Sequence, residues 1–238
     1  MKRAFSLLVI TILLFSSCSS KKGEVKENPY KLDIVATTDA YLESVKQDST
    51  NILIDLEKYI PGIVLDIRYA DTNNFTHSKI YTLPKAYLRK PAADSLLKIQ
   101  QDLAKKRLGI KIYDAYRPYA ATLYFYKVYH DTTFVAAPWK GSIHNRGCAV
   151  DLSLIDLKTG KELEMPTQFD SFSDKASHKC MDLDSAALAN RAVLAEVMLS
   201  HGFTIYDSEW WHYNLKQRDA YKLMDISFEE LEALNKKN

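Results

Sequence analysis

Two short segments, about sixty residues apart, hold the side chains with the clearest chemistry. The first runs Ser142-Ile-His144-Asn-Arg-Gly-Cys-Ala-Val-Asp151, and the second is Glu209-Trp-Trp-His212. Together they supply two imidazoles and two carboxylates. Two His and one Asp can hold Zn²⁺ at three corners of a tetrahedron and leave the fourth for water. We therefore predict that His144, Asp151 and His212 bind one zinc ion.

The remaining carboxylate, Glu209, can act as a base on that water, so hydrolysis is the predicted reaction. With a single anionic ligand, the zinc keeps a net positive charge and can lower the pKa of its water to about 7. Gly147 permits a tight turn between His144 and Asp151, which favours a ligand over an isolated loop histidine. Arg117 could cap or pair at a helix start, or its cation could face the developing oxyanion.

The elements that must position these side chains can be read from hydrophobic periodicity and capping residues. Strands are predicted at residues 62–69, 110–114, 149–154 and 203–213, and helices at residues 90–104, 117–128, 184–200 and from 227 onward. Strands and helices do not alternate regularly. The predicted fold is therefore a single α+β domain with a central, largely antiparallel sheet flanked by helices.

The strand periodicity makes one structural demand on the site. Alternation over residues 149–154 puts the larger apolar side chains on one face and Asp151 on the other. Glu209 and His212 are three positions apart, so a flat strand would place them on opposite faces. A turn or bulge is required between them if both are to reach one metal ion.

The N-terminal residues are typical of export. Lys2-Arg3 precedes an apolar run over residues 5–15, which is too short to span a bilayer and suits a signal peptide. Small residues and Cys18 follow, as in bacterial lipoproteins. We expect a signal peptide over 1–18, a lipid anchor on Cys18, a polar tether over 19–50 and one domain over 51–238. The alternative is an ordinary cleaved signal peptide with an incidental cysteine.

Charge and cysteine content restrict the partners and the compartment. The net charge is +2 and basic residues form no long run, so nucleic acid is not an expected partner, and no obligate protein partner is indicated. The expected location is the cell envelope, on the periplasmic side of a membrane. Cys148 and Cys180 could form a disulfide there, or remain two free thiols.

The two site motifs resemble the zinc D-Ala-D-Ala peptidases whose fold is related to the Hedgehog signalling domain. More narrowly, the chain is similar to the D-alanyl-D-alanine dipeptidases of the VanX type. Further matching stretches lie at residues 66–70, 74–75, 114–118, 165–170 and 177–178. The resemblance therefore extends over nearly all of the predicted domain. Pro166 stands where this family commonly has Gly, which affects the expected shape of the neighbouring pocket.

The resemblance implies roles for nine residues. It implies zinc ligation by His144, Asp151 and His212, general-base catalysis by Glu209, transition-state stabilisation by Arg117, and a dipeptide pocket lined by Tyr69, Tyr81, Ser142 and Asp170. The Asp170 carboxylate suits the free ammonium of a dipeptide. The implied substrate is a small D,D-dipeptide, above all D-Ala-D-Ala.

Three alternatives stay open at this point. The nearest is a D,D- or L,D-carboxypeptidase that trims longer peptidoglycan stem peptides with the same metal chemistry. Such relatives tend to carry Pro before the Trp-His pair, where this chain has Trp210. A non-catalytic module that binds zinc or cell wall should lack the base, yet Glu209 is present. A purely structural lipoprotein would bind no metal.

Overall fold

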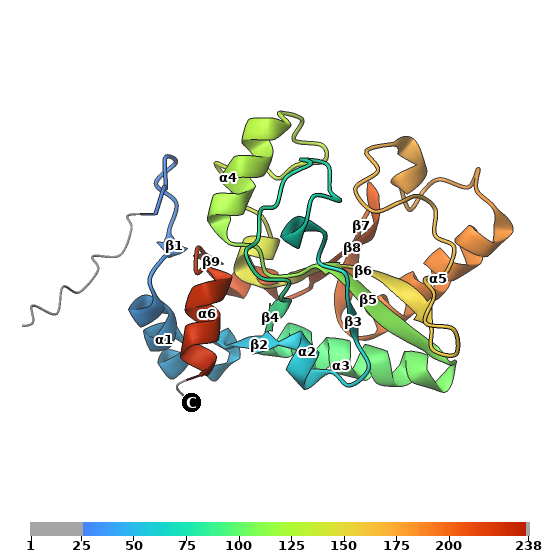
Figure 1. The fold of residues 1–238 in the computed structure, drawn as a ribbon, viewed down its shortest axis with the longest axis horizontal. Coiled ribbons are helices and arrows are strands. Elements are labelled where there is room, and N and C mark those ends of the chain that lie inside the picture. Colours follow the sequence, from blue (N-terminus) through green and yellow to red (C-terminus); the bar gives the residue numbers. More distant parts are fainter. Residues whose placement is uncertain (1–25, 237–238) are drawn as a thin grey trace, which may run out of the picture.

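The computed structural model describes residues 26–236, and its centre is a five-stranded sheet in the order β3-β5-β6-β8-β7 (Figure 1). Its strands are β3 Val64–Leu65, β5 Leu108–Asp114, β6 Ala149–Asp156, β7 Phe203–Tyr206 and β8 Glu209–Leu215. Only β3 and β5 pair in parallel; the other neighbours are antiparallel. The predicted α+β domain with a largely antiparallel sheet is confirmed.

Helices cover both faces of this sheet. They are α1 Thr38–Gln47, α2 Leu56–Tyr59, α3 Lys90–Lys105, α4 Tyr119–Val128, α5 Ser185–Ser200 and α6 Phe228–Asn235. In Figure 1, α3 runs beneath the sheet and α4 stands on the opposite side. Helix α3 contacts β5 and α5, and its buried face repeats every three or four residues, as a core-facing helix requires.

Two short strand pairs and several 3₁₀ turns complete the fold. Strand β2 Leu53–Asp55 pairs with β4 Tyr87–Arg89, and β1 Ile34–Val35 pairs in parallel with β9 Leu223–Met224. The 3₁₀ turns are Ser49–Asn51, Arg68–Ala70, His144–Arg146, Asp174–Ala176 and Arg218–Ala220. The buried side chains of all these parts form one continuous core.

Most predicted elements are present, and one strand is shorter than expected. The predicted capping box exists: Ser227 Oγ accepts from the Glu230 N–H at 3.2 Å, and Glu230 returns a bond to the Ser227 N–H at 2.7 Å. The strand predicted over 62–69 ends at Leu65. Beyond it the chain turns, because the Tyr69 carbonyl accepts from the N–H groups of residues 80 and 81 rather than from a strand.

The tether predicted over residues 19–50 is wrong for its second half. Strand β1 and helix α1 lie within it and belong to the domain. Tyr41 is 4% exposed, and its hydroxyl accepts from the Leu53 N–H at 2.8 Å. The polar average of the segment conceals a few apolar side chains that are enough to dock it. The predicted signal peptide and Cys18 lie outside the described residues.

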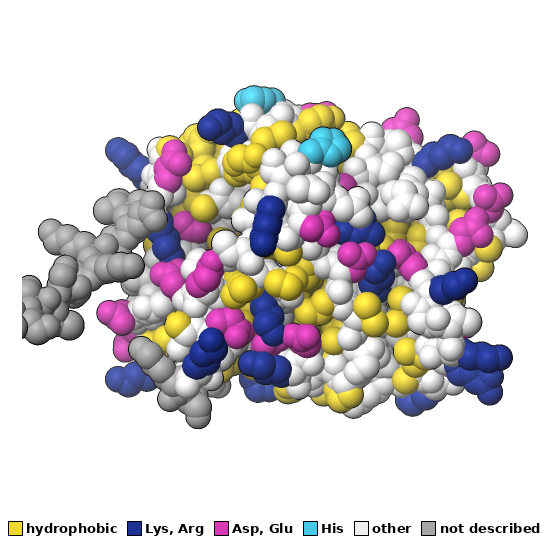
Figure 2. All heavy atoms as spheres, viewed as in Figure 1, with side chains coloured by type: hydrophobic (Ala, Val, Ile, Leu, Met, Phe, Trp, Pro, Cys, Tyr) yellow, Lys and Arg dark blue, Asp and Glu magenta, His cyan; other side chains and the backbone are white. Residues whose placement is uncertain are grey.

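Three further observations concern the molecule as a whole. Within residues 26–236, no helix combines the length and the apolar character needed to cross a bilayer. Cys148 and Cys180 are both free thiols, so the second alternative for this pair is correct. Figure 2 shows positive and negative side chains interspersed over one face of the molecule.

Candidate active site

Three side chains of the site form one row across the sheet. Asp114 at the end of β5 is the cross-strand partner of Asp151 on β6, and Asp151 is the partner of His212 on β8. Directly opposed residues of antiparallel strands project from the same face. A register shift after Ile112 brings Asp114 into this row. Strand pairing alone therefore gathers two of the predicted ligands and one further carboxylate.

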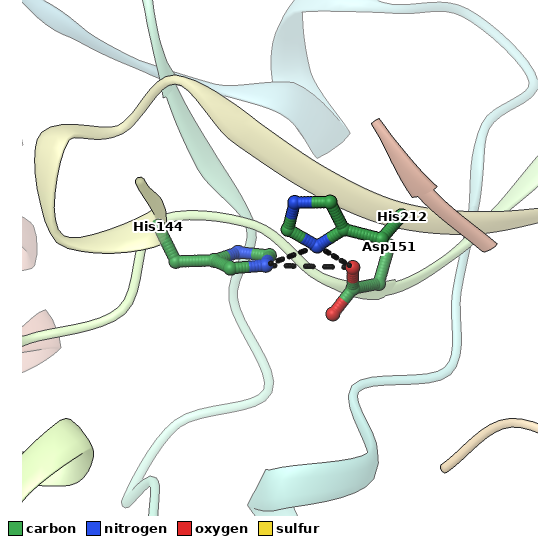
Figure 3. Close-up of side chains that lie close together, drawn as sticks. All are labelled: His144, Asp151 and His212. Carbon is green, nitrogen blue, oxygen red and sulfur yellow. Dashed lines mark hydrogen bonds and ion pairs between the residues drawn. The ribbon is translucent and has the colours of Figure 1, made fainter. Parts of the chain in front are cut away.

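His144 reaches the row from the 3₁₀ turn that precedes β6. Gly147 ends this turn at φ +69, a conformation that favours glycine, and a Cβ there would lie 2.8 Å from Leu53 Cδ2. The turn brings His144 Nε2 to 3.4 Å from Asp151 Oδ1 and 3.2 Å from His212 Nδ1. His212 Nδ1 lies 3.0 Å from Asp151 Oδ1, so the three atoms converge (Figure 3).

Each imidazole forms a hydrogen bond on the side away from the other two candidate ligands, and this bond decides which ring nitrogen carries the proton. His144 Nδ1 lies 2.7 Å from the Ala115 carbonyl oxygen, and His212 Nε2 lies 2.9 Å from Asn214 Oδ1. Both partners are acceptors, so these nitrogens carry the protons and the converging nitrogens carry lone pairs. Two lone pairs and a carboxylate that face one another require a cation. The donor set therefore fits a metal ion.

The charge state of the Asp151 carboxylate agrees with this role. Burial would raise the pKa of Asp151, but positive charge and hydrogen-bond donation at His144 and His212 hold it well below its ordinary value, and a metal ion bound in place of those protons would act in the same direction. The carboxylate is thus anionic at neutral pH, as a metal ligand must be. All three ligands lie in the described part of the chain within a few ångströms of one another, as the sequence predicts.

Glu209 reaches the same site through an irregular hairpin. The β7 and β8 strands pair Ile205 with Tyr213 but Tyr206 with Glu209, so the start of β8 bulges. This irregularity is the required departure from a flat strand, and it leaves Glu209 Oε2 3.8 Å from His212 Nδ1. Burial raises the pKa of Glu209 to about 7. A carboxylate with that pKa is well suited to accept a proton near neutral pH.

Arg117 is held beside the ligands by a buried ion pair. Its Nε and Nη2 donate to Asp114 Oδ2 at 2.9 and 2.7 Å, and Nη2 lies 3.9 Å from Asp151 Oδ2. The guanidinium also lies over the rings of Phe125 and Tyr69, at 4.7 and 5.4 Å from their centroids. Burial would lower the pKa of Arg117, but Asp114 raises it, so the group stays cationic.

Asp170 marks another wall of the site. The Tyr69 hydroxyl lies 3.1 Å from both carboxylate oxygens of Asp170, and Asp170 itself adopts φ +61. Burial raises the pKa of Asp170 well above its ordinary value, and the charge of Asp151 acts in the same direction. A cationic ligand group placed beside this carboxyl would favour its ionised form and pair with it.

A cavity of about 190 Å³ connects these groups. Eight of the nine predicted site residues line it: Tyr69, Arg117, Ser142, His144, Asp151, Asp170, Glu209 and His212. Tyr81 does not line this cavity, so that prediction is wrong. Its buried hydroxyl donates to Asp114 Oδ1 at 2.9 Å, on the far side of the ion pair with Arg117. Tyr81 therefore stabilises the Asp114 carboxylate that holds Arg117 in place.

Sequence reasoning missed several cavity residues. Asn214 orients His212, and its position two residues further along the strand was a usable signal because both side chains share a face. Tyr206 pairs with Glu209 across the hairpin, its ring 5.3 Å from that of His212. Phe134 and Phe172 stack at 4.8 Å on the cavity wall, and no local pattern in their loops indicated this.

The chain matches known proteins over most of the described region. The M15 peptidase family model described as D-ala-D-ala dipeptidase matches residues 49–230. A D-alanyl-D-alanine dipeptidase of Escherichia coli K12 is 34% identical over 179 residues, which cover 75% of this chain and 92% of that protein. One of Enterococcus faecalis is 30% identical over 185 residues, covering 69% of this chain and 92% of that protein.

Among solved structures, the LD-carboxypeptidase LdcB aligns with a TM-score of 0.40 and 20% identity, over 75% of this chain and 77% of that one. The sequence relatives carry the assignment, because the family match spans the segments that hold His144, Asp151, Asp170, Glu209 and His212. The chain therefore belongs to the D-Ala-D-Ala dipeptidase family and is a peptidase.

Proposed function

We propose that this peptidase is a zinc D,D-dipeptidase that hydrolyses D-Ala-D-Ala in the cell envelope. The observation that carries the proposal is the arrangement of a cluster of metal donors and a separate carboxyl around one small cavity. Three converging metal donors and Glu209 contribute to its wall, and a separate, partly buried carboxyl, Asp170, contributes to the same wall. A dipeptide presents a scissile carbonyl and a free ammonium only a few ångströms apart, which suits this arrangement.

Bound by His144, Asp151 and His212, Zn²⁺ would act as a Lewis acid and lower the pKa of water at its open position. The protein side chains supply the remaining steps. Glu209 accepts a proton from the attacking water and returns it to the leaving amine. Arg117, fixed by Asp114, stabilises the negative charge that develops on the carbonyl oxygen.

Asp170 and Tyr69 would bind the amino end of the substrate. The Asp170 carboxyl is partly buried and contacts the Tyr69 hydroxyl, so a substrate ammonium would form an ion pair with it, while an uncharged end would leave the carboxyl protonated and without an ionic partner. This requirement distinguishes a dipeptidase from an enzyme that trims long peptides, whose substrates carry an amide at the same position.

The proposal is tested by comparing D-Ala-D-Ala, N-acetyl-D-Ala-D-Ala, L-Ala-L-Ala and a stem pentapeptide with product identification. The free D,D-dipeptide should be hydrolysed at least about a hundredfold faster than its acetylated form, because acetylation removes the charge and adds bulk. Asp170→Asn should narrow this gap by slowing the free dipeptide. Asp174→Asn, an exposed carboxylate of the neighbouring turn, is the matched control.

Preference for the pentapeptide would replace this proposal with a carboxypeptidase while leaving the metal hydrolase intact. Equal rates for the free and acetylated dipeptides would remove the role of Asp170.

The location in the cell envelope is proposed from the N-terminal sequence alone. Lipidation of Cys18 should place the full-length protein in the membrane fraction, and Cys18→Ser should either release it or leave an uncleaved precursor. Mass spectrometry of the mature N-terminus provides the measurement. A lipid-free mature protein with the natural Cys18 would contradict the anchor.

A further inference from the structure

The start of β8, which carries Glu209, is weakly supported by the sheet itself. Strand β6 pairs with β8 from His212 onward, so Glu209 to Trp211 have no cross-strand partner on that side. On the other side the β7 pairing is irregular, and the two-residue turn Asp207-Ser208 immediately precedes Glu209. A base at such a position needs support from outside the sheet if its carboxylate is to stay in place.

That support comes from the loop before α5. The Asp207 carbonyl oxygen accepts two hydrogen bonds, from Ser177 Oγ and from the His178 backbone N–H, each at 2.9 Å. Arg191, a buried residue of α5, in turn donates from Nη1 to the Ser177 carbonyl at 2.9 Å. The turn before Glu209 is thus tied through Ser177 to a helix of the core.

The side chain of His178 adds a second contact to the same strand. Its ring packs edge-on against Tyr213 of β8, with centroids 6.0 Å apart. Burial lowers the pKa of His178 to about 4. The imidazole is neutral at physiological pH, so it contacts β8 through packing against Tyr213 rather than by charge.

The next residue of β8 is held by the same long loop. Trp210 Nε1 donates to Thr167 Oγ1 at 3.0 Å, three residues before Asp170. The segment from Thr167 to His178 therefore carries Asp170, the carboxyl proposed to bind the substrate ammonium. The same segment forms hydrogen bonds with Asp207 and Trp210, which lie on either side of Glu209 in the sequence. The spacing between Asp170 and Glu209 is fixed by this segment.

We propose that Ser177 and His178 are positioning residues that hold Glu209 at the distance from the metal ligands that proton transfer requires. The inference rests on the proposed role of Glu209 as base. Displacement of a catalytic group by about 1 Å can cost up to about a hundredfold in rate, so loosening this turn should lower kcat without affecting the metal site.

The first experiment compares full-length enzyme variants with substitutions in this loop. Ser177→Ala removes one donor to Asp207, Ser177→Thr restores a hydroxyl, and His178→Ala removes the packing of the ring against Tyr213. Lys179→Ala is the control, because Lys179 Nζ forms only an exposed ion pair with Asp207 at 2.6 Å. Metal content, kcat and KM are measured for each.

We expect kcat to fall about tenfold or more in Ser177→Ala and in His178→Ala, with KM within about twofold and metal content unchanged. Ser177→Thr should recover most of the rate, and Lys179→Ala should match the natural enzyme. Hydrogen exchange of the peptide that spans residues 205–213 should accelerate in Ser177→Ala. This last measurement needs no substrate.

A double-mutant cycle with Glu209→Gln tests whether the loop acts through the base. Ser177→Ala should have little further effect on the residual rate of Glu209→Gln, because the group that it positions is absent. Additive losses in the cycle, or a normal kcat and normal exchange in Ser177→Ala, would overturn the proposal. So would a fall in kcat accompanied by equal loss of metal, which indicates a general structural role.

The reference activity separates this proposal from the proposed function. If the natural enzyme cleaves the stem pentapeptide instead of D-Ala-D-Ala, the substrate assignment fails, and the same cycle is measured on the pentapeptide.

Discussion

Glu209 owes its chemistry to its surroundings more than to its residue type. It is 8% exposed, it lies 3.8 Å from the nearer nitrogen of His212, and burial raises its pKa to about 7. An exposed glutamate would be almost fully ionised at neutral pH and a weaker base. Burial thus makes this carboxylate a better proton acceptor, while the sheet and the loop before α5 hold it in place.

The substitution Glu209→Gln should abolish turnover while the metal site stays intact. It keeps the shape of the side chain and removes the base, so kcat should fall by about 10² to 10⁴. Metal analysis should still find about one zinc per chain. Glu196→Gln, an exposed position on α5, should behave like the natural enzyme. Near-normal activity of Glu209→Gln would assign the proton transfer to another group.

The pH dependence of kcat/KM should reveal this carboxylate. Glu209 must be ionised to accept a proton, so the rate should fall as the pH drops through its pKa. Burial raises that pKa to about 7, and a cation on the neighbouring ligands favours the carboxylate and lowers the value from there. We expect a single acid limb with an apparent pKa no higher than about 7. If the acid limb persisted in Glu209→Gln, the group that titrates would be another residue.

At this scale the sequence predicted which side chains come together, because residue type and spacing restrict them strongly: His144, Asp151, Glu209 and His212 all line one cavity. It failed where a contact depends on long-range packing. Tyr81 was expected on the pocket wall, but its hydroxyl bonds to Asp114 instead. The sequence alone could not show whether Asp114 pairs with Arg117 or is solvated, because both states are compatible with the same residues. The structure shows the ion pair.

Among the elements, the 3₁₀ turn before β6 has the strictest requirements. Gly147 needs φ +69, and a methyl group at this position would meet Leu53 and Arg89. This crowding matters for function because the same turn aims His144 at the other two ligands. The turn therefore couples backbone conformation directly to metal binding.

The substitution Gly147→Ala should destabilise the fold by about 1–3 kcal/mol and weaken metal binding. Gly160→Ala is a matched control, because Gly160 has the same φ of +69 but nothing within 4 Å of the added methyl group. Urea denaturation and metal titration of both variants separate backbone strain from the clash. Equal metal affinity in the two would show that His144 does not depend on this turn.

The elements also show where sequence patterns are reliable. Helices α3 and α5 and the capping box of α6 follow from periodicity and local capping, so they were predictable. The bulge at the start of β8 was required by the chemistry, but its form could not be predicted. It depends on the pairing of β7 with β8, a non-local contact that no single segment specifies.

On the scale of the whole molecule, the candidate metal site is built from segments that lie far apart in the sequence. Its ligands come from the turn before β6, from β6 and from β8, which pack into one core. Without a cation, two lone pairs and a buried carboxylate would oppose one another. Metal binding should therefore contribute to global stability as well as to catalysis.

Removal of metal by a chelator should lower the melting temperature by about 10 °C, since a ligand at about 1,000 times its Kd stabilises the fold by about 4 kcal/mol. Added Zn²⁺ should restore it. His144→Ala should melt at the lower temperature whether or not chelator is present. Calorimetry provides the measurement, and an unchanged melting temperature after verified metal loss would argue that the site is formed independently of the ion.

The state of the two thiols offers a way to observe global opening. Cys148 is fully buried, and burial raises the pKa of its thiol to about 12, whereas Cys180 is partly exposed. Alkylating reagents attack the thiolate, so Cys148 reacts only when the domain unfolds around it. The rate at which Cys148 is labelled, compared with the rapid labelling of Cys180, therefore measures how often the native domain opens. Measuring this rate in the absence and in the presence of substrate compares the opening of the free and the substrate-bound protein.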